Sequence, residues 1–154
     1  MLAFLDADDL WTPNKLSLQT AALGEDPRRD MVLGSVEQFY SPELAPLPEP
    51  PRAGETPSPG FSPGALLIRR ESFFRVGLFS TEFRVGEFID WYARATEAGL
   101  VFQQSPDVVL RRRIHNTNLG IRQRHARGDY ARVVKAALDR RRGAVRRPER
   151  GPSS

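Results

Sequence analysis

The chain has 154 residues, of which 40% are hydrophobic and 27% are charged, a composition typical of one globular domain. Its apolar runs are far shorter than the roughly 18 residues that a membrane span needs, and the opening MLAFLDADDL is too short and too soon acidic for a signal peptide, so we expect a cytoplasmic protein. The absence of cysteine excludes disulfides and thiolate metal sites.

The formal net charge of +4 is unevenly distributed along the chain. Residues 1–121 carry 12 Lys and Arg against 16 Asp and Glu, whereas residues 122–154 carry 11 against 3. The body is therefore mildly acidic and the C-terminal end is strongly basic. A basic end of this kind attracts nucleic acid, anionic lipid or an acidic partner.

The chain opens with the pattern of a strand, an acidic turn and a helix. Met1–Leu5 is short and apolar, as in a buried strand, and it stops at Asp6. Thr12 predicts a helix N-cap, with Pro13 at the first helical position and Gly24 as the C-terminal stop. We expect the apolar face of this helix to be formed by Leu16, Leu18, Ala22 and Leu23.

Further strands and helices alternate along the rest of the chain, which predicts an α/β protein. The segment 41–63 contains eight prolines and predicts a long surface loop. The Arg-, Pro- and Ser-rich residues 143–154 predict a disordered tail. The remaining elements are strands at 30–40, 64–68, 101–103 and 108–114, and helices at 69–76, 87–98 and 122–141.

The acidic turn Asp6-Ala7-Asp8-Asp9 is the first candidate site. Asp6 and Asp8 follow a strand directly, and their spacing of two points both carboxylates the same way in extended backbone. A hard divalent cation such as Mg²⁺ or Mn²⁺ would offset their mutual repulsion. Aspartates before a helix are also common as caps and turn formers, so the pattern alone leaves both interpretations open.

The segment FLDADDLWTPNKL resembles the strand, DxD motif and helix of inverting family 2 glycosyltransferases, which have the GT-A type of fold. The resemblance implies a partial GT-A fold with a mixed sheet flanked by helices. It also implies that Asp6 and Asp8 hold a divalent cation that binds the diphosphate of a nucleotide-sugar donor. Asp9 would assist in binding that donor.

A second segment, GALLIRRESFFRVGLFSTEFRVGEFIDWYARATEAGL, is similar to the acceptor side of the same family. There a G-E-D segment usually supplies the base that deprotonates the acceptor hydroxyl. Here Phe88 replaces the second acid, so the resemblance leaves two candidate bases, Asp90 and Glu87, with Asp90 slightly preferred. Trp91 is either a core aromatic residue or a platform for the acceptor sugar.

A third segment, Arg111 to Asn118, looks like the R-x-H-x-x-N segment that follows the last strand in related glycosyltransferases. The resemblance assigns Arg113, His115 and Asn118 to the donor diphosphate. Alternation along a strand places Arg111, Arg113 and His115 on one side. Guanidinium groups suit phosphate because of their forked geometry.

The basic C-terminal end predicts a helix at 122–142 after a catalytic domain at 1–121. Its apolar residues indicate a solvated helix packed against the body, while its charge suits an anionic membrane surface or an acidic protein. Contact with a membrane surface would make the protein peripheral to the membrane. Nucleic acid is a less favoured partner, because no helix-turn-helix, RNA-binding aromatic pair or zinc pattern accompanies the charge.

The resemblance also implies that the nucleotide-binding half of the family's domain would lie before Met1. We therefore expect a glycosyltransferase that moves a sugar to an acceptor hydroxyl with inversion, and a chain that is a poor enzyme in isolation. The alternative is a non-catalytic remnant that contacts an anionic partner through its basic end.

Overall fold

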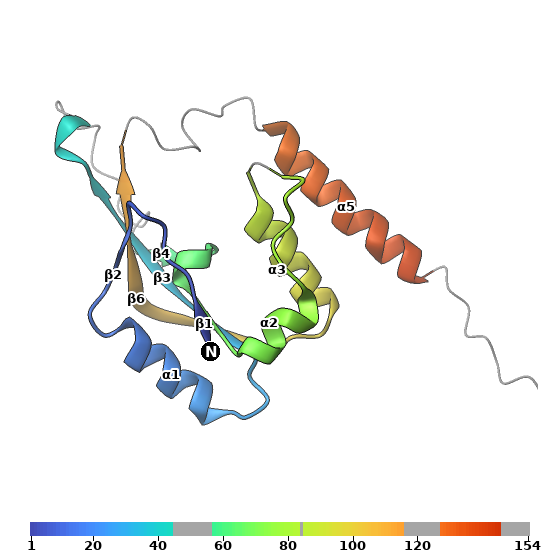
Figure 1. The fold of residues 1–154 in the computed structure, drawn as a ribbon, viewed down its shortest axis with the longest axis horizontal. Coiled ribbons are helices and arrows are strands. Elements are labelled where there is room, and N and C mark those ends of the chain that lie inside the picture. Colours follow the sequence, from blue (N-terminus) through green and yellow to red (C-terminus); the bar gives the residue numbers. More distant parts are fainter. Residues whose placement is uncertain (45–56, 84, 116–126, 146–154) are drawn as a thin grey trace, which may run out of the picture.

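The computed structural model describes residues 1–44, 57–83, 85–115 and 127–145. Within these ranges the chain is an α/β protein with a curled, mixed sheet of six strands and four α-helices, as the alternating pattern predicted (Figure 1). The strands are β1 (Leu2–Ala3), β2 (Leu10–Trp11), β3 (Met31–Tyr40), β4 (Ser58–Pro59), β5 (Leu66–Ile68) and β6 (Phe102–Ile114). The helices are α1 (Lys15–Glu25), α2 (Arg70–Val76), α3 (Glu87–Glu97) and α5 (Arg127–Val145).

The long strand β3 organises the sheet, whose order is β1-β5-β3-β6-β2 with β4 also paired to β3. The β3–β6 pair is parallel, and the other pairs are antiparallel. Consequently β1, β3 and β6 all run in the same direction, while β2 runs the opposite way. The short strands β1 and β2 therefore lie at opposite edges of the sheet, although only six residues separate them in sequence.

Strand β6 is continuous, so the prediction of two separate strands at 101–103 and 108–114 was wrong. The register against β3 shifts between Leu33 and Ser35 and again between Ser35 and Val36, where β6 has extra residues. These bulges accommodate Pro106 without breaking the strand. Gly34 lies beside them, and a Cβ on it would meet the side chain of Val109 at 2.3 Å.

Helix α1 differs from the prediction in its start and in its buried face. Thr12 does not cap the helix, because its hydroxyl donates instead to the carbonyl of Val108 (3.0 Å), and the N-cap is Asn14. The helix also continues through Gly24 to Glu25. Its buried residues are Lys15, Gln19 and Leu23, while Leu16 is 48% exposed.

Two buried polar side chains of α1 hold it against the sheet through hydrogen bonds. The ammonium of Lys15 donates to Gln19 Oε1 (2.6 Å) and to the carbonyl of Leu66 (3.3 Å). The amide of Gln19 donates to the carbonyls of Val32 (3.1 Å) and Ala65 (2.8 Å). These bonds satisfy groups whose burial would otherwise be unfavourable, which explains why polar residues replace the predicted apolar stripe.

The main core lies on the other face of the sheet, under α2 and α3. Alternation along β3 turns Met31 and Leu33 toward these helices and Val32 toward α1. Trp91 is fully buried in this core, and its ring stacks on Phe73 at 5.2 Å between centroids. Its indole N–H donates to the carbonyl of Gly77 (2.8 Å), so Trp91 is a core aromatic residue and not a surface for a sugar.

Parts of the predicted loop and tail segments form regular structure. Residues 45–56 of the proline-rich segment lie outside the described residues, but its ends form 3₁₀ turns at Pro42–Leu44 and Pro63–Ala65 and the edge strand β4. Helix α5 includes residues 143–145, which the sequence assigned to a disordered tail. Within the described residues, none of the helices is both long and apolar enough to cross a membrane.

Candidate functional site

The acidic turn crosses one end of the sheet. It leaves the end of β1 at one edge and reaches the start of β2 at the other. The same end of the sheet carries the carboxyl ends of the parallel strands β3 and β6, and the turn lies beside the end of β6 in Figure 1. Ligands of open α/β sheets bind outside the carboxyl ends of strands, so the turn occupies the expected place for a site.

His115 and Asp8 form a close polar contact in this site. The imidazole Nε2 of His115 lies 2.7 Å from the carboxylate oxygen Oδ2 of Asp8, 107 residues earlier in the chain. The hydrogen bond from His115 lowers the pKa of Asp8 below its ordinary value, and the nearby positive charge of Arg112 acts in the same direction. The Asp8 side chain remains 43% exposed and can therefore reach a ligand.

Arg113, which belongs to β6, donates hydrogen bonds to the same turn. Its guanidinium Nε donates to the carbonyl of Asp8 (3.1 Å), and its backbone N–H donates to the Asp9 carboxylate (3.0 Å). Asp9 is 9% exposed, and burial raises its pKa, to which the charges of Asp8 and Asp6 contribute. The structure thus brings together Asp8, Asp9, Arg113 and His115, all of which the sequence assigned to the donor site.

Asp6 lies on the exposed side of the turn. Its carbonyl accepts a hydrogen bond from the backbone N–H of Asp9 (3.2 Å), which closes the turn. Among the described residues, no group of three or more His, Asp and Glu side chains is arranged to hold a metal ion. The carboxylates of Asp6 and Asp8 have the oxygen chemistry that suits Mg²⁺ or Mn²⁺, and a cation here would need ligand oxygens from a substrate or water to complete its shell.

Glu43 belongs to the same end of the sheet and was missed in the sequence. It follows β3, and the hydroxyl of Ser41 donates to its carboxylate. This hydrogen bond lowers the pKa of Glu43, as do the positive charges of His115 and Arg113. Because β3 and β6 are parallel neighbours, the residues just after Tyr40 lie close to the residues just after Ile114. The sequence did not reveal this proximity, because the many prolines from Pro42 onward predicted a surface loop.

Two arginines of β6, Arg111 and Arg113, contact side chains of β3. Arg111 lies 3.9 Å from Glu37 in an exposed ion pair, and the guanidinium groups of Arg111 and Arg113 both stack on the ring of Phe39. This common partner confirms that the two side chains share one side of the strand. Asn118, the third predicted donor-site residue of this segment, lies outside the described residues.

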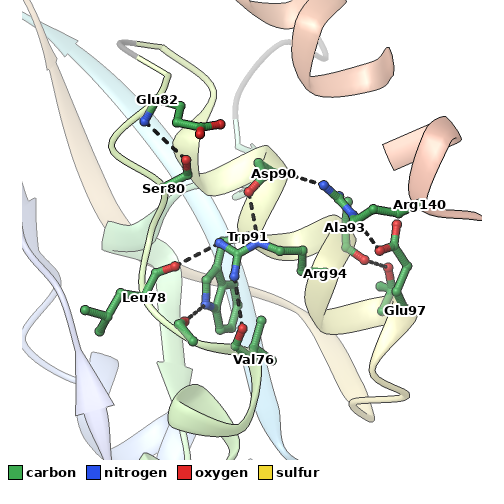
Figure 2. A network of polar contacts seen from close by, with 12 residues as sticks. Val76, Leu78, Ser80, Glu82, Asp90, Trp91, Ala93, Arg94, Glu97 and Arg140 are labelled. Atoms are coloured by element: carbon green, nitrogen blue, oxygen red, sulfur yellow. Dashed lines mark hydrogen bonds and ion pairs between the residues drawn. The ribbon is translucent and has the colours of Figure 1, made fainter. Parts of the chain in front are cut away.

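Asp90, one of the two candidate bases, is buried and joins a network of ion pairs between α3 and α5 whose arginines are partly exposed (Figure 2). Its oxygen Oδ2 accepts from Arg94 Nε (2.9 Å) and Oδ1 accepts from Arg140 Nη1 (3.1 Å). Arg94 also donates to the carbonyls of Val76 and Leu78, and Arg140 to Glu97 Oε2 (2.8 Å). Both oxygens of Asp90 are therefore committed to structural contacts.

Glu87 has a different environment one turn earlier on α3. It is half-buried and makes no ion pair with another of the described residues. Phe88, which stands where the glycosyltransferase pattern has its second acid, is 4% exposed and stacks on Trp91 at 6.2 Å. The N-terminal end of α3 and the end of β6 lie toward the same end of the molecule in Figure 1, but the described contacts do not join Glu87 or Asp90 to the acidic turn.

Neither a protein-family model nor a curated protein sequence matches this chain significantly.

Proposed function

We propose that this chain is part of an inverting, metal-dependent glycosyltransferase with a partial GT-A fold, and that its acidic turn binds the diphosphate of a nucleotide sugar. The observation that carries the proposal is the contact between Asp8 and His115. The resemblance assigns the DxD segment and the R-x-H segment to the same diphosphate, and the 2.7 Å contact between residues 107 positions apart supports that assignment.

The residues of the turn have complementary parts in this proposal. Asp6 and Asp8 would hold the divalent cation, which supplies positive charge to the diphosphate. Arg113 orients the turn through the Asp8 carbonyl and the Asp9 carboxylate, so that a change at Arg113 disturbs both acids together. His115 fixes the direction of the Asp8 carboxylate, and Asp9 stays buried beneath them.

The transfer itself forms one bond and breaks another. The acceptor hydroxyl oxygen bonds to the anomeric carbon from the face opposite the diphosphate, the bond from that carbon to the diphosphate oxygen breaks, and its electron pair leaves with the diphosphate. The hydroxyl proton passes to a carboxylate. We assign this role to Glu87 in preference to Asp90, because both oxygens of Asp90 already accept hydrogen bonds from arginines.

Calorimetric titration of the chain with UDP and with GDP, in the presence and absence of Mn²⁺, tests the proposal. We expect binding that requires the cation and that is lost in the Asp6→Asn/Asp8→Asn variant. The matched control is Asp26→Asn, which removes a half-buried aspartate outside the site. Binding that does not need the cation, or that survives the double substitution, would contradict the role of the acidic turn, and so would a folded chain that binds neither nucleotide.

The second candidate function is nucleotide-sugar binding without transfer, as in a non-catalytic remnant. The core position of Phe88 and the ion pairs of Asp90 favour it, because they leave Glu87 as the single candidate base of this segment. A transfer assay with radiolabelled sugar distinguishes the two functions. If the parent chain transfers sugar and Glu87→Gln does not, while Mn²⁺-dependent nucleotide binding persists in that variant, the second function is excluded.

A further inference from the structure

Helix α5 carries apolar side chains on two sides. Val133 is 1% exposed, and with Arg140 it faces α3. Tyr130, Val134 and Leu138 lie at intervals of four beside this face and are 44%, 56% and 46% exposed, and the ring of Tyr130 also lies next to Gly86 at the start of α3. We call these three residues the outer stripe. An exposed apolar row at helical spacing is typical of an interaction surface.

The outer stripe has basic neighbours. Among the described residues, this surface also includes Lys135, Arg142 and one acid, Asp139, and all of its lining residues belong to α5. The helix as a whole carries six Lys and Arg against two Asp. Two copies of such a helix would repel each other, so charge disfavours a dimer through the outer stripe and favours an anionic partner.

We propose that the outer stripe of α5 docks on the surface of an anionic membrane. An apolar ridge with lysine and arginine alongside is the pattern of helices that lie in the plane of a bilayer interface, where aliphatic side chains enter the acyl boundary and the basic groups meet lipid phosphates. Tyrosine suits this level because it has an apolar ring and a polar tip. A bilayer accepts a ridge on one helix, whereas an acidic protein would have to supply a matching groove.

The inference does not depend on the proposed function. The acidic turn and the outer stripe belong to different elements, and no residue is shared between them. The Asp6→Asn/Asp8→Asn variant should therefore bind vesicles as the parent chain does, so failure of one proposal is distinguishable from failure of the other.

Co-sedimentation of the full chain with vesicles tests the docking surface. We expect binding to phosphatidylcholine vesicles that contain phosphatidylglycerol, and much weaker binding to phosphatidylcholine alone, with an affinity that falls as salt is raised. The Val134→Gln/Leu138→Gln variant keeps the charge but removes the apolar stripe, and should bind roughly tenfold or more weakly. Lys135→Gln and Arg142→Gln should each weaken binding by roughly fivefold.

The matched control is Leu16→Gln on α1, which removes a leucine that is 48% exposed and should bind as the parent does. Near-ultraviolet circular dichroism of buried Trp91 verifies that each variant is folded. Three results would overturn the proposal: no binding to anionic vesicles, equal binding by the parent and the Val134→Gln/Leu138→Gln variant, or a stripe-dependent dimer or acidic-protein complex in place of vesicle binding.

Discussion

The imidazole of His115 and the carboxylate of Asp8 lie 2.7 Å apart, although 107 residues separate them in the chain. A carboxylate in its ionised form accepts hydrogen bonds and cannot donate them, so the contact places the imidazole proton on Nε2. The pair thereby links the acidic turn to the end of β6. It also gives the candidate site a spectroscopic signature that does not require a ligand.

We predict that neutral His115 is the tautomer with its proton on Nε2. Long-range proton–nitrogen NMR of uniformly labelled chain should show this tautomer for His115, and the preference should disappear in Asp8→Ala. The sequence has a second histidine, His125, which gives its own imidazole signals. The signals that disappear in His125→Gln belong to His125, and those that remain belong to His115. A neutral His115 with its proton on Nδ1 and none on Nε2 would show that the contact with Asp8 does not form in solution.

Buried Lys15 should make the stability of the chain rise with pH above neutrality. Burial lowers the pKa of Lys15 from 10.5 to about 8 in the folded chain. Between these values the unfolded chain binds more protons than the folded chain, so the free energy of unfolding increases as pH rises from about 8 to 10.5. Urea unfolding across this range should show the increase in the parent chain and a smaller one in Lys15→Met.

The control for this prediction is Lys135→Met, which removes the other lysine of the chain from an exposed position on α5. Its unfolding free energy, measured over the same pH range, gives the comparison for Lys15→Met. An identical pH dependence in Lys15→Met and Lys135→Met would mean that Lys15 is solvated in the folded chain.

How far the sequence predicts this fold depends on which interactions dominate at each position. Strand β3 and helix α3 were predicted correctly, β3 because it is an apolar run whose first six residues are all buried, and α3 because its apolar residues recur at helical spacing and the core buries them. Gly77 and Gly99 end their helices at positive φ of 93° and 74°, as their positions after α2 and α3 indicated. Where the local sequence pattern and the tertiary contacts favour the same secondary structure, the sequence alone predicts that structure.

The errors occur where a distant partner overrides the local pattern. Lys15 and Gln19 are polar, and only the carbonyls of β3, of β5 and of the residue before β5 explain why α1 buries them. The continuity of β6 through Pro106 depends on the register against β3. At the candidate site, the convergence of Asp8 and His115 was anticipated through the family resemblance, whereas Glu43 and the ion pairs of Asp90 required knowledge of which strands and helices are neighbours.

The two candidate bases on α3 should differ sharply in their effect on stability. Asp90→Ala leaves Arg94 and Arg140 without their shared acid in a mostly buried network, and should lower the free energy of unfolding by about 3 kcal/mol. Glu87→Gln should change it by no more than about 0.5 kcal/mol. Urea unfolding at neutral pH measures both, and equal effects would show that the network in Figure 2 contributes little to stability.

Gly60 and Gly24 should respond oppositely to alanine. A Cβ on Gly60 would lie 2.6 Å from the carbonyl oxygen of Gly34 and 2.6 Å from the Cβ of Ala65, neither of which is the end of a flexible side chain. Gly60→Ala should therefore lower the unfolding free energy by about 2 kcal/mol. Gly24 has nothing within 4 Å of its added Cβ and lies in α1, so Gly24→Ala should raise it by about 0.5 kcal/mol. Thermal unfolding of both variants checks the opposite signs.

Restoring the acid that the glycosyltransferase pattern has at Phe88 should not restore a base. The Phe88 side chain is 4% exposed and packs against Phe79 and Trp91, so Phe88→Asp would place a carboxylate in the aromatic core and remove that packing. We expect a loss of about 3 to 5 kcal/mol in the free energy of unfolding.

The neighbouring substitution Ile89→Asp separates this effect from that of an added charge on α3. Ile89 is 42% exposed, so the same acid there should change the free energy of unfolding by less than about 1 kcal/mol. A stable Phe88→Asp variant that gains sugar transfer would instead mean that α3 turns this position toward the substrate when the site is occupied. The core contacts of Phe88 would then describe a resting arrangement, and the choice of Glu87 as the base would have to be abandoned.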